Sequence, residues 1–480
     1  MARLNSLNPE RVFNYFEQIC AIPRGSENMK AISQYCIDFA KNHSLEAVRD
    51  EADNVIIYKP ATTGYESSEP IILQGHLDMV CQKTDDCNID FDKDGLDVYI
   101  DGDFVKAKGT SLGADNGIAV AMILAILESS DISHPAIEAV FTTDEEIGMC
   151  GAMVLDMKKL NAKRMINLDA EEDDILTVSC AGGSDFRITM PIEFENKKGN
   201  RIDISLKGLR GGHSGVEINS NRVNANKLAA RFLNHMKNIC EFELISINGG
   251  DKGNAIPNSC QISLCTDNAS SFETTANDCL AVIKAEISDR EPQFSYDICI
   301  SEKTDCKAIK SDIKDKLIFG LLIVPNGVCE MSSEIENLVE SSQNLGILKT
   351  TDSEIILHFT LRSNKQSALN FLEDRMKAFA DSLNSEYEAS GHYPPWEFNS
   401  NSQLQNIYKE CFVQEFGTIP KVEAIHAGLE CGIFSSAIDG LDCIAMGPSL
   451  FDVHTVNERL SITSTEKIYN LLIKILKSCR

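Results

Sequence analysis

Ten consecutive residues, Ile118–Leu127, are apolar without exception. A helix at a protein surface carries a polar face, so a run that is apolar on every face predicts a helix buried within an α/β layer. The run is too short to cross a bilayer, and no other segment reaches the roughly 18 apolar residues of a membrane span. Asp115 and Asn116 stand at its start, where such side chains commonly cap free backbone N–H groups.

Short apolar segments typical of buried strands alternate with helical stretches around this run. Four of these segments are Ile71–Gln74, Ile137–Thr142, Met165–Leu168 and Cys443–Met446. The alternation predicts an α/β fold with a mostly parallel mixed sheet flanked by helices. The chain closes with an amphipathic helix from about Ser464, for which Thr463 and Glu466 fit a capping box.

The middle of the chain has a different pattern, in which half-buried strands are separated by long helices. The predicted strands are 186–190, 201–207, 260–265, 294–301 and 354–362, and the predicted helices are 225–238, 271–288 and 368–383. Such a pattern is typical of an α+β domain inserted into the first domain. We therefore expect a first domain formed by 1–183 and 391–480 and an inserted domain formed by 184–390, with Tyr393-Pro394-Pro395 as a stiff return.

The chain is strongly acidic, with 72 Asp and Glu against 45 Lys and Arg and a formal net charge of -27. Such a surface repels phosphate backbones and anionic lipid, which argues against nucleic-acid and membrane partners. Most of these charges are expected to form a solvated surface, although they also favour cations near a carboxylate cleft. Seventeen cysteines without a CxxC pair indicate reduced thiols, and the N-terminus shows no apolar leader. Together these features predict a cytoplasmic protein.

Histidines and carboxylates recur at the carboxyl ends of the predicted strands. They are His76, Asp78, Glu145, Glu146, Asp169 and His454, and Asp115 joins them at the start of the apolar helix. Each has an ordinary explanation when taken singly, such as a helix cap for Asp115 or a solvated turn for the acids after the second strand. Ligands of open α/β sheets bind at the carboxyl ends of strands, so together the residues predict one site. Two histidines and three carboxylates suit two zinc-like ions that share a bridging carboxylate.

The wording and order of several motifs extend this prediction. They are GHLDMV, GADNG, TTDEEIGMCGA, NLDAEE, GLRGGHSG, GNAIPN, HAGLECGIF and the late His454. With these motifs the chain resembles the di-zinc metallopeptidase family that holds aminoacyl-histidine dipeptidases, carnosinases and aminoacylases. The resemblance runs from about Asn8 to the C-terminus. It implies that the first domain is a di-zinc aminopeptidase-like catalytic domain and that the inserted domain is its lid.

The resemblance also implies a role for each residue of the site. Asp115 matches the carboxylate that bridges two zinc ions. His76 and Asp169 match the ligands of one ion, and Glu146 and His454 match those of the other. Glu145 matches the general base that takes a proton from a bridging water, and Asp78 matches the residue that orients His76.

Substrate contacts are implied for four further residues. His213 resembles a lid histidine that stabilises an oxyanion, Asn254 and Arg362 are candidates for the substrate carboxylate, and Glu430 is a candidate for the free amine. The ordinary alternatives are a turn residue for Asn254, a strand-end ion pair for Arg362 and a structural acid for Glu430, and His392 and His426 stay unassigned. The run His454-Thr455-Val456-Asn457-Glu458 departs from the family's His-Ser-Pro-Asp-Glu, because the missing Pro changes the turn. This departure affects the expected substrate fit more than the metal role of His454.

The function implied by the resemblance is hydrolysis of small unblocked dipeptides, including Xaa-His dipeptides such as β-alanyl-histidine. Two Zn²⁺ ions per subunit are expected, with Co²⁺ or Mn²⁺ as substitutes, and a bridging hydroxide would attack with Glu145 as base. Lid closure would bring His213 to the metals, in cis or across a homodimer. The alternatives are an N-acyl amino-acid amidohydrolase or a tripeptidase on the same scaffold, and a metal-binding protein without activity.

Overall fold

The computed structural model describes residues 4–480, which divide into two compact units. Unit 1 contains the chain up to Cys180 together with 396–424 and 429–480, and unit 2 contains 181–395 and 425–428. The expected boundaries, 183/184 and 390/391, therefore fall inside unit 2. One strand of its sheet already starts at Gly182, and another ends only at Tyr393. The short segment 425–428 was not expected there. It belongs to unit 2 because the Ala181 N–H donates to the carbonyls of Ile425 and Ala427.

Unit 1 combines helices with two sheets. Its helices are α1 (Glu10–Cys20), α2 (Lys30–Asn42), α3 (Ala114–Glu128), α4 (Cys150–Val154), the 3-10 turn Met157–Lys159, α9 (Gln403–Phe416), α10 (Glu430–Ala437) and α11 (Ile462–Ser478). Its strands are β1 (Glu46–Arg49), β2 (Val55–Lys59), β3 (Ile71–His76), β4 (Val98–Asp101), β5 (Phe104–Ala107), β6 (Ile137–Thr142), β7 (Arg164–Asn167), β8 (Ile175–Cys180), β20 (Lys421–Ile425), β21 (Asp442–Ala445), β22 (Leu450–Phe451) and β23 (Arg459–Ser461).

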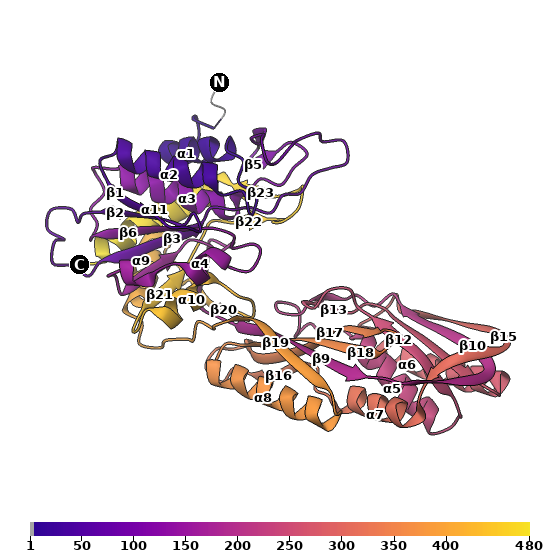
Figure 1. Cartoon of the computed structure of the whole chain (residues 1–480). Helices are drawn as coiled ribbons and strands as arrows, with labels where there is room; N and C mark the ends of the chain where they lie inside the picture. The colour runs from indigo at the N-terminus through magenta and orange to yellow at the C-terminus, as the bar shows by residue number, and fades with distance from the viewer. Residues whose placement is uncertain (1–3) are drawn as a thin grey trace. The chain divides into compact units, whose positions relative to one another are not determined.

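The main sheet of unit 1 has the strand order β1-β2-β6-β3-β7-β21-β8-β20, and α1, α2 and α3 lie together on one side of it (Figure 1). Strands β6, β3, β7 and β21 are parallel, whereas β1–β2, β2–β6 and β21–β8 are antiparallel. The predicted mixed, mostly parallel sheet is thus confirmed. Its register sets His76 beside Thr142 and Gln74 beside Asn167, so the parallel strands end along one edge.

The apolar run is confirmed as the buried helix α3, in which every residue from Asn116 to Leu127 is buried. The predicted cap is wrong, because neither Asp115 nor Asn116 accepts a hydrogen bond from the first turn. Their backbone dihedrals are non-helical, and Gly113, with a φ of 64°, turns the chain into the helix. The acceptor for these N–H groups comes from elsewhere in the chain, as described below.

The second sheet of unit 1 has the order β22-β23-β5-β4, and the connection between β22 and β23 carries His454. The predicted capping box of the last helix is wrong. Ser461 caps α11 by accepting from the Ser464 N–H at 3.2 Å, while the Thr463 hydroxyl instead donates to Asp103. The helix therefore starts two residues earlier than its apolar stripe indicated.

Unit 2 is built on a large antiparallel sheet with the order β15-β10-β14-β12-β17-β18-β9-β19, with β16 beside β17. The strands are β9 (Gly182–Pro191), β10 (Phe194–Lys207), β12 (Glu243–Gly249), β14 (Cys260–Thr266), β15 (Ser295–Ile309), β16 (Gly327–Met331), β17 (Val339–Thr350), β18 (Glu354–Ser363) and β19 (Glu386–Tyr393), and β11 (Gly212–His213) pairs separately with β13 (Ala255–Ile256). The helices are α5 (Ala225–Lys237), α6 (Ala269–Ile287), α7 (Ser311–Ile323) and α8 (Gln366–Ser382).

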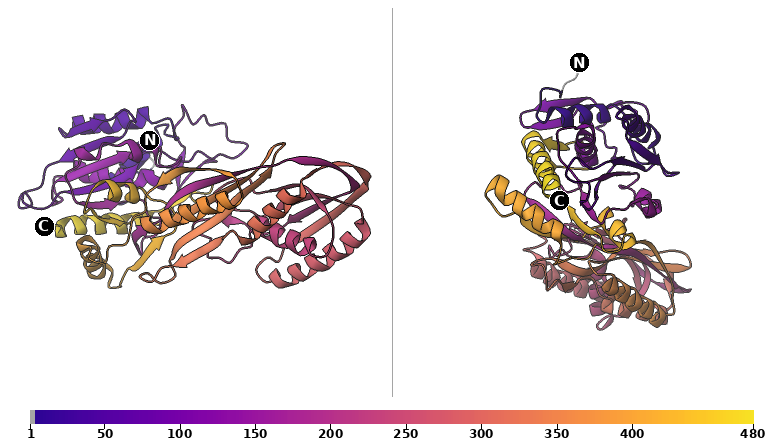
Figure 2. Two further views of the ribbon diagram at one scale, coloured as in Figure 1. Left: turned by 60° about the horizontal axis from the view of Figure 1, so that its bottom comes forward. Right: turned by 90° about the vertical axis from the view of Figure 1, so that its left-hand side faces the viewer.

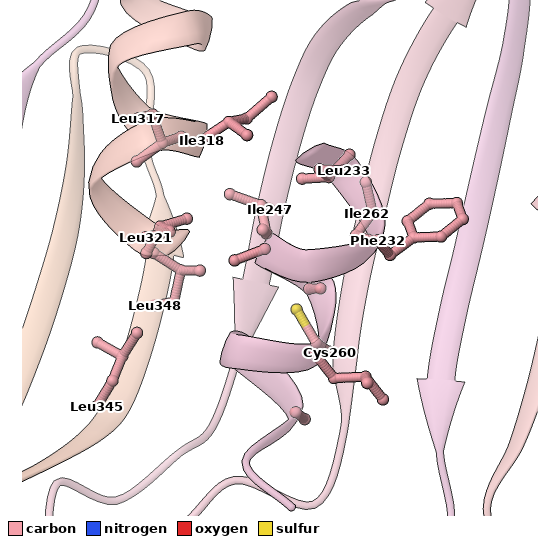
Figure 3. Close-up of a cluster of buried hydrophobic side chains, with 14 of the residues drawn as sticks. Phe232, Leu233, Ile247, Cys260, Ile262, Leu317, Ile318, Leu321, Leu345 and Leu348 are labelled. Carbon is pink, nitrogen blue, oxygen red and sulfur yellow. The ribbon is translucent and has the colours of Figure 1, made fainter. Parts of the chain in front are cut away.

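Alternating burial along these strands places one face of the sheet against helices α5 to α8 (Figure 2). Figure 3 shows part of this core, to which Leu233 of α5, Leu317 of α7 and the sheet residues Ile247 and Leu348 contribute side chains. The α+β architecture predicted for the middle of the chain is thereby confirmed, although α7 and the strands β12, β16, β17 and β19 were not predicted. All seventeen cysteines are free thiols, and among residues 4–480 no helix is long and apolar enough to cross a membrane.

Candidate metal centre

Two histidines face the same carboxylate at the edge where the parallel strands end. The Nε2 atom of His76 lies 3.1 Å from Oδ1 of Asp115, and the Nε2 atom of His454 lies 3.2 Å from Oδ2 of the same residue. Each imidazole has a second carboxylate partner, Asp169 at 3.5 Å from His76 and Glu146 at 2.9 Å from His454. All five residues predicted as metal ligands therefore converge, with Asp115 between two separate pairs.

The charges of this cluster are unbalanced. Among residues 4–480, no Lys or Arg forms an ion pair with these three carboxylates. Hydrogen bonds to Asp115 and Glu146 raise the pKa of His454 to about 11, whereas burial raises the pKa of Asp169 to about 6 against the influence of His76. Asp169 and both imidazoles thus hold protons strongly, whereas hydrogen bonds from His454 and His76 lower the pKa of Asp115 despite its burial. This pattern fits a site in which carboxylates outnumber cations.

The donor set fits metal ions of the zinc type. One ligand atom from each of His76, Asp115 and Glu146 lies within 4.8 Å of the others. Imidazole nitrogen and carboxylate oxygen are the donors that zinc uses in catalytic sites, and a carboxylate with its two oxygens facing different ligand pairs can serve two ions. Metal cations bound among these side chains would balance the negative charge of the three carboxylates.

Asp78 lies directly behind His76 and is fully buried. Its Oδ1 atom is 3.2 Å from Nδ1 of His76, on the side of the ring opposite Asp115. It also accepts from the backbone N–H groups of Glu145 and Glu146 at 3.0 and 3.1 Å, and from the Ser26 hydroxyl at 2.9 Å. One carboxylate therefore fixes the ring of His76 and positions the loop after β6.

Glu145 is half-buried beside this cluster. Burial raises its pKa well above the usual value, and the charges of Asp169 and Glu430 add to the effect while His76 opposes it. A carboxyl with a raised pKa takes up a proton more readily than an ordinary carboxylate, a property that suits a general acid–base group.

Glu430, at the start of α10, has no solvent-exposed surface. Its Oε2 atom accepts from Gln74 Nε2 and from the Thr142 hydroxyl, which lies 2.7 Å away. Its Oε1 atom has no hydrogen-bond partner among the described residues, and burial raises its pKa to about 7. The side chain therefore lies beneath the ends of β3 and β6 with one oxygen left for a donor.

Three supporting residues were not predicted from the sequence. Asn116 accepts from the His76 N–H at 3.2 Å and donates to the Leu168 carbonyl at 2.9 Å, so it joins two of the strand ends. Glu458 and Arg24 both hydrogen-bond to the backbone that leads into Asp115. Of these three residues, only Glu458 had a signal in the sequence, which is its position four residues after His454.

In unit 2, His213 is held by its own turn. Its Nδ1 atom accepts from the N–H groups of Gly215 and Val216, both at 3.3 Å. Because Nδ1 is an acceptor, the proton of the neutral ring lies on Nε2. A Cβ on residue 215 would meet the His213 ring at 2.9 Å, so glycine is required for this approach. Burial and the charge of Arg362 lower the pKa of His213, which keeps the ring a neutral donor.

Arg362 and His426 lie close enough to His213 for their charges to act on one another. Arg362 is buried, donates to the Tyr393 hydroxyl at 2.6 Å and leaves its Nε atom without a partner among the described residues. His426 contacts Ser342 at 2.7 Å and Asn364 at 3.2 Å. Asn254 is exposed, and its carbonyl accepts from the Ser214 N–H next to His213. The predicted unit 2 residues thus form a second group, to which the structure adds His426.

Comparison with known proteins gives consistent results for sequence and structure. The profile of Peptidase family M20/M25/M40 matches residues 72–478. The chain is 36% identical to the cytosol non-specific dipeptidase of Escherichia coli (strain K12), over 99% of each chain.

Solved structures extend the comparison to the fold. The aminoacylhistidine dipeptidase of Vibrio alginolyticus matches with a TM-score of 0.90 and 34% identity, over 99% of this chain and 98% of that one. The aminopeptidase PepT of Bacillus cereus matches over 98% of this chain and 99% of that one, with a TM-score of 0.57 and 16% identity, which indicates a shared fold alone.

Proposed function

Because this chain belongs to Peptidase family M20/M25/M40, we propose that it is a metallopeptidase that hydrolyses unblocked dipeptides. The observation that carries this proposal is Asp115, whose two oxygens face two different histidine–carboxylate pairs. The E. coli and Vibrio relatives, which match over the full length at 36% and 34% identity, are dipeptidases, which favours this activity over an N-acyl amino-acid amidohydrolase, a tripeptidase or an inactive metal-binding protein.

The proposed metal ligands are His76 and Asp169 for one ion, Glu146 and His454 for the other, and Asp115 for both. Zinc is the proposed metal, because the donors are two imidazoles and three carboxylates. Two such ions supply Lewis-acid polarisation of a carbonyl and acidification of a water.

Glu145 is the proposed general acid–base residue. Its carboxyl takes up a proton as the peptide carbonyl is attacked and delivers that proton to the leaving nitrogen. Its raised pKa supports this transfer, because a buried carboxyl whose charged form is disfavoured binds a proton more readily than an ordinary carboxylate does. Asp78 is the proposed positioning residue, since it contacts His76 and holds the backbone of Glu145.

Substrate recognition is proposed for four residues. His213 offers an Nε2–H donor for an oxyanion, while Arg362 and Asn254 offer donors for a terminal carboxylate. Glu430 offers its unpartnered Oε1 atom for a free amine. Recognition of both charged ends would restrict the enzyme to dipeptides, and Xaa-His dipeptides are among the proposed substrates because the Vibrio relative is an aminoacylhistidine dipeptidase.

We also propose that the protein is located in the cytoplasm and forms a homodimer. The E. coli relative is named a cytosol enzyme, and the seventeen free thiols fit a reducing compartment. Cell fractionation tests the location, and sedimentation equilibrium of the purified protein tests the assembly.

Metal analysis combined with a substrate panel tests the function. The purified protein is expected to bind two zinc ions per chain, to lose activity with a chelator and to regain it with Zn²⁺. It should hydrolyse β-alanyl-histidine and other unblocked dipeptides, but not an N-acetyl amino acid, and it should cleave a tripeptide much more slowly. Activity that survives complete metal removal, or a preference for the N-acetyl substrate, would contradict the proposal.

A further inference from the structure

Glu458 binds the backbone that precedes the proposed bridging residue. Its Oε2 atom accepts from the N–H groups of Leu112 and Gly113 at 2.7 and 2.9 Å. Its Oε1 atom accepts from Ala114 at 2.8 Å and from Asp115 at 3.4 Å. The side chain is 3% exposed, so water does not compete for these donors. A residue 343 positions away in sequence thus satisfies the free N–H groups at the start of α3.

This arrangement changes what Asp115 is free to do. An aspartate in the first turn of a helix ordinarily caps that helix, because the free N–H groups there attract its carboxylate. Here those donors are already engaged by Glu458, and Asp115 makes no cap. Its two oxygens instead face His76 and His454. Capping and metal binding are therefore divided between two carboxylates.

Arg24 binds the same loop through a backbone carbonyl, whereas Glu458 binds it through backbone N–H groups. Arg24 is 2% exposed, and its guanidinium donates to the Gly113 carbonyl and also to the carbonyls of Leu77 and Asp78 at 2.9 Å each. A Cβ on Gly113 or Gly117 would lie 2.5 or 2.6 Å from Arg24 Nη2, so the two glycines leave room for it. The loop that carries Asp115 and the loop that follows His76 are thereby tied to one cation.

We propose that Glu458 is a positioning residue of the metal centre, which keeps Asp115 available as the bridging ligand by capping α3 in its place. This inference rests on the proposed metal site. It assigns Glu458 no contact with substrate, so its removal should weaken metal binding and lower kcat while leaving KM for a dipeptide unchanged.

The test compares Glu458→Gln with a matched substitution elsewhere in unit 1. Glutamine keeps the shape but has only one acceptor oxygen, and its NH₂ group faces N–H donors. Glu138→Gln is the control, because Glu138 is also buried and accepts from the backbone N–H groups of Asn161 and Ala162, near the start of β6 and away from its catalytic end. Both variants should lower the melting temperature of the metal-free protein.

Zinc affinity, measured by competition with a chromophoric chelator, separates the two variants. Glu458→Gln is expected to bind Zn²⁺ about 10- to 100-fold more weakly and to change the visible spectrum of bound Co²⁺, whereas Glu138→Gln should match the wild type in both. Wild-type affinity and spectrum in Glu458→Gln, or an equal loss in Glu138→Gln, would overturn the inference.

Glu458→Asp keeps the test decisive if the glutamine variant does not fold. Aspartate retains two acceptor oxygens on a side chain one methylene shorter, so its Zn²⁺ affinity should fall below the wild type but exceed that of Glu458→Gln. A folded aspartate variant with wild-type affinity and spectrum would contradict the proposed role. A wild-type protein that itself binds no Zn²⁺ would instead contradict the proposed function, so the two failures are distinguishable.

Discussion

The two units place histidines in opposite electrostatic environments. In unit 1, His454 contacts Asp115 and Glu146, and these hydrogen bonds raise its pKa to about 11. In unit 2, burial and the charge of Arg362 lower the pKa of His426 to about 3. The difference shows that unit 1 presents a surplus of negative charge suited to cations, whereas unit 2 gathers donors suited to an anion such as a carboxylate.

The two groups are also assembled by different means. The proposed ligands of unit 1 come from distant parts of the chain and are fixed by buried side chains such as Asp78. In unit 2, His213 is fixed by the N–H groups of the next turn. A substitution in unit 1 is therefore expected to affect several ligands at once, and one in unit 2 to affect mainly its own contact.

The largest expected effect comes from removing the acid–base group of unit 1. Glu145→Gln should lower kcat by about 10²- to 10⁴-fold, because its amide cannot transfer the proton, while metal content stays at the wild-type level. Steady-state kinetics and elemental analysis measure the two quantities. Glu172→Gln, at an exposed acid near Asp169, serves as the control and should leave both unchanged. Normal turnover in Glu145→Gln would show that unit 1 does not supply the acid–base group through Glu145.

A smaller effect is expected from the buried cation of unit 2. Arg362→Ala should raise KM for a dipeptide about 10- to 100-fold, in line with the loss of a charged hydrogen bond, and leave zinc content intact. Arg187→Ala is the control, because Arg187 is exposed on the same sheet and pairs only weakly with Glu354 at 3.8 Å. An unchanged KM in Arg362→Ala would show that this group does not bind substrate.

The smallest effect concerns how the stability of the metal-free protein changes with pH. The pH dependence contributed by a histidine is expected to have opposite signs in the two units. A His with a raised folded-state pKa stabilises below its unfolded pKa near 6.5, so the contribution of His454 is lost as pH rises toward 11. A His with a lowered pKa stabilises above 6.5, so the contribution of His426 is lost as pH falls toward 3.

Melting temperatures of metal-free His454→Gln and His426→Gln, measured against the wild type across this pH range, test the signs. The deficit of His454→Gln should be greatest near pH 6 and shrink by pH 10. The deficit of His426→Gln should be greatest near pH 7 and shrink toward pH 4. Deficits that change in the same direction with pH would show that the two histidines do not differ as described.

The sequence by itself determined the four parallel strands of the main sheet, the buried helix and the set of side chains at the strand ends. Ile118–Leu127 predicted α3, and the motifs around His76, Glu146 and Asp169 predicted which residues would meet. These predictions succeeded because apolar periodicity is local, and because parallel strands necessarily end on one edge of their sheet.

Only the tertiary structure decided how those residues are supported. The sequence offered only Asp115 and Asn116 as local caps for the start of α3, whereas Glu458, 343 positions from Asp115, accepts from the N–H groups there. Likewise the sequence leaves His426 unassigned, whereas the fold makes 425–428 part of unit 2 and brings His426 near the charge of Arg362. A buried donor takes whichever acceptor the fold brings within about 3 Å, and local sequence does not contain that choice.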